Sequence, residues 1–148
     1  MEQSFAHLDK ALGILLKERE NDPVQQLKRG LRLYVEWGMR HPNEYSIAFL
    51  VRKPSKQKYQ THQAFEVARS LVKLCLNGSR AGGREVELST QALWAATHGI
   101  TSLLVQIPSF PWISKDRLID QVIDSAVCGV VGRRQNLKGR GNSDAKHL

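Results

Sequence analysis

The residues best suited to do chemistry lie in one uncharged segment, LWAATHGITSL, which spans residues 93–103. It places Trp94 and His98 four residues apart, so their rings can touch on one face of a helix. A histidine in such a helix can be a core residue bonded to a carbonyl or hydroxyl, a donor that lines a pocket, or a metal ligand. Gly99 is a weak helix former, and its position predicts that a neighbouring helix packs closely there.

Signatures of catalysis and metal binding are missing from the sequence. The Ala81-Gly82-Gly83 stretch follows no predicted strand and lacks the spacing of a phosphate-binding loop. The five histidines are scattered, and no two lie one helical turn apart with a carboxylate between them. Cys75 and Cys128 show no metal or redox spacing and are expected to be reduced thiols that fill volume. The sequence therefore predicts a protein that is not an enzyme and has no metal or cofactor.

The positive charge is confined to two segments. The chain has 148 residues, enough for one domain, and a net charge of +8. Residues 52–58, RKPSKQK, and residues 133–148 carry all of this excess, and the remaining chain is balanced. This pattern is typical of a solvated loop and a flexible tail. Weak attraction to DNA or to anionic lipid is the alternative.

A membrane span is not expected. Residues 88–114 hold no Asp, Glu, Lys or Arg, but Gln91, His98 and Gln106 would have to enter lipid. Pro108 and Pro111 also interrupt the helix. Since no secretory leader follows Met1, we expect a cytoplasmic protein.

Apolar residues recur at helical spacing along almost the whole chain, with no convincing strand. Asp22 and Ser114 are good N-caps, Pro23 suits the first position of a helix, and Ile113 can pack on Leu118 as a hydrophobic staple. We therefore predict an all-α, single-domain bundle of about six helices in residues 1–132, followed by a basic, disordered tail in residues 133–148. The expected helices cover about 3–19, 23–40, 42–51, 59–77, 85–106 and 114–132.

A set of aromatic side chains is interrupted by a few polar groups. Such a set is most often plain core, but it is also how an apolar small-molecule cavity between helices is built. The candidates for its lining are Tyr34, Trp37, Phe65, Trp94 and His98.

Two local signatures resemble a known family. The Trp-x-x-x-His-Gly pattern of Trp94, His98 and Gly99 lies in the penultimate helix, and YVEWGMRHPNEYSIAF covers residues 34–49. Both are similar to the C-terminal regulatory, WHG-type domain of TetR-family transcriptional regulators. The resemblance implies a domain that dimerises and senses a ligand, with an N-terminal helix-turn-helix domain that binds DNA. That DNA-binding domain, expected before Phe5, is absent from this sequence.

The resemblance also implies the partners. The last two long helices would form a four-helix bundle with a second copy of the chain. The residues themselves favour the same arrangement, because the apolar stripe from Leu118 to Val131 is wider than one neighbouring helix would cover. The expected interface residues are Leu118, Val122, Ile123, Ala126 and Val130. A small, mostly apolar effector would enter between the second, fourth and fifth helices and favour one arrangement of the first.

Two other functions stay open at this stage. The chain could be a module that only dimerises and sequesters a full-length relative, which a solid core would favour. It could also bind nucleic acid nonspecifically through its basic loop and tail.

Overall fold

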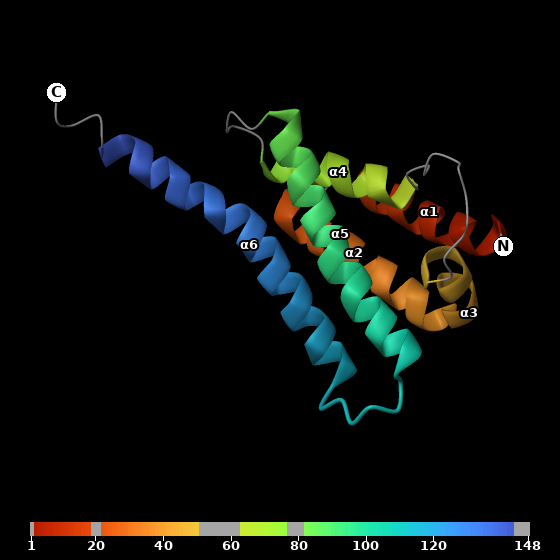
Figure 1. The fold of residues 1–148 in the computed structure, drawn as a ribbon. Helices are drawn as coiled ribbons and strands as arrows, with labels where there is room; N and C mark the ends of the chain where they lie inside the picture. Colours follow the sequence, from red (N-terminus) through yellow and green to blue (C-terminus); the bar gives the residue numbers. More distant parts are fainter. Residues whose placement is uncertain (1, 19–21, 51–62, 77–81, 144–148) are drawn as a thin grey trace, which may run out of the picture.

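The computed structural model describes residues 2–18, 22–50, 63–76 and 82–143, and these residues form helices without a strand (Figure 1). The predicted all-α architecture is therefore confirmed. In chain order the elements are α1 (Glu2–Lys17), α2 (Pro23–Arg40), α3 (Pro42–Tyr45), the π-helix η1 (Ser46–Leu50), α4 (Gln63–Cys75), α5 (Gly83–Gln106) and α6 (Lys115–Ser143). The basic segment 52–58, the expected start of the fourth helix at 59–62 and residues 144–148 lie outside the described residues.

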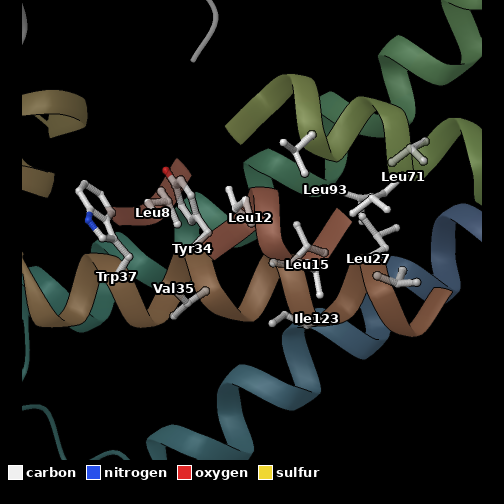
Figure 2. Packing of buried hydrophobic residues seen from close by; sticks show 14 of the residues in the cluster. Leu8, Leu12, Leu15, Leu27, Tyr34, Val35, Trp37, Leu71, Leu93 and Ile123 are labelled. Atoms are coloured by element: carbon white, nitrogen blue, oxygen red, sulfur yellow. The ribbon is translucent and has the colours of Figure 1, made fainter. Parts of the chain in front are cut away.

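Helix α2 is the central element of the bundle. Its start is confirmed: Asp22 Oδ1 accepts hydrogen bonds from the backbone N–H groups of Val24 (3.0 Å) and Gln25 (3.4 Å), and Pro23 is the first helical residue. The helix packs against α1, α4, α5 and α6. Figure 2 shows it between leucines of α1 and α4 on one side and Ile123 of α6 on the other. The core therefore surrounds α2.

Helix α1 is attached to α2 by apolar and polar contacts. Leu8, Leu12 and Leu15 are buried, whereas Leu16 is 41% exposed. The buried amide of Gln26 donates to the carbonyl oxygens of Leu15 (2.9 Å) and Glu18 (3.2 Å). The carbonyl groups at the end of a helix lack their usual intrahelical partners, and this side chain bonds two of them from α2.

Helix α6 begins as predicted but continues further. Ser114 Oγ accepts a hydrogen bond from the N–H of Arg117 (3.2 Å), which confirms the cap. The predicted staple is wrong, because Ile113 is fully exposed. The connection before it is held by another contact, in which Trp112 Nε1 donates to the carbonyl oxygen of Ile107.

Helix α6 continues past residue 132 to Ser143, within the segment that we expected to be a tail. No proline interrupts this stretch, and its Arg, Gln, Leu and Lys residues are good helix formers that let an existing helix elongate. In Figure 1 the C-terminal part of α6 extends away from the other helices.

Charged side chains join α2 to α6 on the surface. Arg32 contacts Asp116 (3.0 Å) and Asp120, and Lys28 contacts Asp124 at 3.1 Å.

None of the helices in the described residues combines the length and the apolar character needed to cross a membrane.

Candidate functional site

A cavity of about 460 Å³ lies between four helices of the bundle. Its lining comes from α1, α2, α4 and α5, together with Phe49 of η1. Aliphatic side chains make up much of the wall: Leu8 and Leu12 of α1, Leu27 and Leu31 of α2, and Val67 and Leu71 of α4. The volume and the apolar lining are those of a site for a small organic molecule.

The structure brings three of the five predicted lining residues together in this cavity, namely Tyr34, Phe65 and Trp94. The rings of Phe65 and Trp94 meet edge to face, with centroids 6.0 Å apart. Trp94 Nε1 donates to the hydroxyl oxygen of Tyr34 at 3.4 Å. The polar atoms of these two side chains therefore contact each other, and apolar ring surface is left for the cavity.

The other two predicted residues, Trp37 and His98, do not line the cavity. Trp37 is buried on α2, with its ring centroid 5.9 Å from His41 and 6.2 Å from Tyr45. His98 is half-buried, and its Nδ1 lies 2.5 Å from the hydroxyl oxygen of Tyr45. This is the packing expected of a core histidine whose ring nitrogen meets a hydroxyl. The predicted ring contact with Trp94 is present, at 5.9 Å between centroids.

Burial also determines the charge of this pair. Burial lowers the pKa of His98, which favours the neutral imidazole. Burial is the main cause that raises the pKa of the Tyr45 hydroxyl above its ordinary value, and the neighbouring Tyr34 is the second cause. Both groups are therefore uncharged at neutral pH, as an apolar surrounding requires.

The remaining hydroxyls of the segment have a local explanation. The buried side chains of Thr97 and Thr101 each donate to a carbonyl oxygen four residues earlier, at 2.7 and 2.6 Å. Such bonds within the helix let a hydroxyl enter an apolar core without an unsatisfied donor.

The prediction that a helix packs closely on Gly99 is wrong within the subunit, because a Cβ there would have no neighbour within 4 Å. The close approach lies instead at Gly38 of α2, where a Cβ would lie 2.4 Å from Thr101 Cγ2 and 3.0 Å from Tyr45 Cδ2. The helix crossing thus depends on the glycine of α2, since that residue is where α2 meets α3 and α5.

Polar residues occupy one part of the cavity wall. Glu87 of α5 lines the cavity and accepts from Arg69 of α4, at 2.8 Å from Nε and 3.2 Å from Nη2. Arg69 also donates to Glu66 at 2.5 Å. The hydrogen bonds from Arg69 lower the pKa of Glu87, which is therefore ionised at neutral pH. Asp9, Gln63, Gln91 and Thr97 are further polar residues of the lining.

Sequence reasoning missed the contribution of α1, the role of Phe49 and the polar wall. The helix over residues 3–19 was expected, but whether its leucines pack on α2 alone or also line a cavity depends on where α4 lies. Nothing in the sequence distinguished Glu87 from the other exposed carboxylates, because its position follows from the crossing of α4 and α5.

The predicted dimer residues occupy one side of α6. Ile123 is buried inside the subunit, whereas the other four, Leu118, Val122, Ala126 and Val130, are half-buried at the edge of the core. Their part in an interface stays a prediction. Among the described residues, no group of three His, Cys, Asp or Glu side chains is placed to hold a metal ion.

An all-helical domain with an apolar cavity between its helices is thus the class of protein that the fold and the site define. Residues 27–126 match the family of Tetracyclin repressor-like C-terminal domains, and the chain belongs to this family. Domains of this family are regulatory rather than catalytic. No curated protein and no solved structure matches the chain.

Proposed function

We propose that the chain is the ligand-sensing and dimerisation domain of a cytoplasmic TetR-like transcriptional regulator. The observation that carries the proposal is the cavity of about 460 Å³, lined mostly by apolar and aromatic side chains. Cavities of this size suit small-molecule ligands. The effector is small and mostly apolar, and it lies against Tyr34, Phe65 and Trp94.

The position of α1 supports a mechanism for the response. Leu8 and Leu12 line the cavity, so a ligand would contact α1 directly. A ligand that binds one arrangement of α1 more tightly than another shifts the population toward that arrangement. In a regulator with a helix-turn-helix domain ahead of α1, the shift changes the spacing of two DNA-binding heads. DNA binding itself requires that additional domain.

Surface composition on α5 and α6 supports the homodimer. Leu88 and Leu103 of α5 are 59% and 42% exposed, and Ala92 and Gly99 lie between them on the same helical face. On α6 the exposed Gly129 continues the side that carries Leu118 and Val122. Small and apolar side chains at helical spacing allow two copies of the helix pair to approach closely, as a four-helix bundle needs.

Filling the cavity tests the ligand proposal. Ala68 of α4 lines the cavity, so Ala68→Leu occupies part of the volume that a ligand needs. A thermal-shift screen of small apolar molecules is expected to raise the Tm of the wild type, and Ala68→Leu should reduce that rise. Ser70→Leu is the control, since Ser70 is exposed on the same helix. Compounds that stabilise all three proteins equally, or none that stabilises the wild type, would count against the proposal.

A module that only dimerises is less well supported. That function was expected to accompany a solid core, and the cavity is the observation that weighs against it.

A further inference from the structure

The lining of the cavity changes along α2. Around Gly30 it is aliphatic: a Cβ on this glycine would lie 3.8 Å from a methyl carbon of Leu12 and of Leu71, and Leu27 is one turn away. These three leucines are no more than 3% exposed. One turn further along α2, at Tyr34, the lining becomes aromatic. The cavity therefore has a deep aliphatic part and an aromatic part.

The aromatic part is formed by four rings from four different elements: Tyr34, Phe49, Phe65 and Trp94. Phe49 meets Tyr34 at 5.9 Å and Trp94 at 6.5 Å between centroids, both edge to face. Tyr45, which does not line the cavity, packs on Phe49 at 5.1 Å and on Tyr34 at 6.0 Å. The rings are thus held in position before a ligand enters, which lowers the entropy cost of binding.

The aromatic part borders the exposed edge of the cavity. Phe49, Phe65 and Trp94 are half-buried, whereas Gln63 and Gln91, which also line the cavity, are exposed. Gln91 precedes Trp94 by one turn of α5, and α4 begins at Gln63, just before Phe65. Each of these amides is uncharged and carries both a donor and an acceptor. The edge therefore suits a neutral polar group.

The two carboxylates of the described lining already have partners. Glu87 accepts from Arg69 with both of its carboxylate oxygens, and Asp9 also interacts within the protein. A charged group on a ligand would have to compete with these contacts and would lose its own hydration. A hydroxyl or an amide on the ligand leaves them intact, so the lining favours a neutral ligand.

We propose that the cavity takes a neutral, alkyl-substituted aromatic compound, with its ring in the aromatic part, its alkyl chain among the leucines and its polar group at the two glutamines. The inference rests on the proposed ligand-binding function and adds the class and the orientation of the ligand. An aromatic ring gains edge-to-face contacts that a saturated ring of similar size lacks. One such contact corresponds to about a two- to tenfold difference in affinity.

Two alcohols that differ only in the saturation of the ring test this class. They are para-butylbenzyl alcohol and its ring-hydrogenated counterpart, trans-butylcyclohexylmethanol, and isothermal titration calorimetry measures their affinities for the full chain. The saturated alcohol is the more hydrophobic of the two. The informative quantity is therefore the change in the ratio of the two affinities when the protein is substituted, because the transfer of each alcohol from water cancels in that comparison.

Phe65→Leu removes one ring of the aromatic part and keeps an apolar side chain. It should lower the affinity for the benzyl alcohol about two- to tenfold more than the affinity for the saturated alcohol. Leu71→Met is the matched control in the aliphatic part, since it preserves the side-chain volume and removes no ring. It should change both affinities by the same factor. Phe49→Leu repeats the test on another element, and urea denaturation checks that each variant is folded.

The orientation is tested on the wild type. Intermolecular NOEs are expected between the ring protons of the bound benzyl alcohol and aromatic side chains, and between its terminal methyl group and leucine methyl groups. The reverse pattern would overturn the proposed orientation, and ring protons that contact only leucines would overturn the aromatic class without any substitution.

The remaining outcomes separate the inference from the proposed function. A larger loss for the benzyl alcohol in a folded phenylalanine variant supports the inference, whereas equal losses for both alcohols, or the same differential loss in Leu71→Met, overturn it and leave the ligand site in place. If neither alcohol binds although the thermal-shift screen yields other ligands, the inference alone fails. If neither alcohol binds and the screen finds no compound, the proposed function fails with it.

Discussion

The hydroxyl oxygen of Tyr45 lies 2.5 Å from Nδ1 of His98, and this contact joins α3 to the middle of α5. The same hydroxyl lies 3.3 Å from the backbone carbonyl oxygen of His98. Tyr45 is completely buried, so its hydroxyl needs a partner within the protein. The pair explains why an apolar helix contains a histidine: the imidazole satisfies a buried phenol from the neighbouring element.

Stability should fall in mild acid because of His98. Burial holds its pKa in the folded protein below the unfolded value of about 6.5. The unfolded chain therefore binds the proton first, and stability is lost as the pH falls from about 6.5 through the folded pKa, with no further loss from this residue below it. Urea midpoints at pH 7.5 and pH 5 measure the loss, which should be smaller in His98→Gln. An equal loss in both proteins would contradict this assignment.

Gly38 should tolerate no side chain. In Gly38→Ala the new Cβ meets Thr101 and Tyr45 at distances that force α2 and α5 apart. We expect a cost of about 1–3 kcal/mol in the free energy of unfolding, although alanine is the better helix former. Gly13→Ala is the control, since a Cβ there meets nothing within 4 Å, and it should gain up to about 1 kcal/mol. Urea denaturation measures the free energy of unfolding of both variants. If the two substitutions change it by the same amount, the packing argument is refuted.

Gly99 should be essential for the dimer and dispensable for the fold. A side chain there meets nothing in its own subunit, so Gly99→Arg should fold normally. In a four-helix bundle that uses this face of α5, however, the arginine would separate the two copies. Sedimentation velocity at micromolar protein should show a dimer for the wild type and a monomer for Gly99→Arg.

The control for that experiment is Gly13→Arg on α1, where the space is equally open but the proposed interface is remote. This variant should remain a dimer. A monomeric wild type, or a Gly99→Arg variant that still dimerises, would reject the proposed interface.

Much of the fold could be predicted from local signals. The caps at Asp22 and Ser114 and the break between the helices expected over 23–40 and 42–51 were predicted correctly, because each depends on hydrogen bonds or sterics within about one helical turn. The staple of Ile113 on Leu118 failed although it is also a local motif. The packed rings of Phe110 and Trp112, 4.5 Å apart between centroids, belong to the connection that leaves Ile113 in solvent.

The sequence by itself determined that the chain is helical, where most helices begin, and that Trp94 and His98 share a face and belong to a recognisable family pattern. Only the tertiary structure decided which side chains meet across helices: Tyr34 and Trp94 in the cavity, and His98 with Tyr45 outside it. The physical reason is the range of the interactions. Helix formation depends on residues three or four positions apart, whereas these contacts depend on how helices cross: Tyr45 and His98 are 53 positions apart in sequence, and Tyr34 and Trp94 are 60.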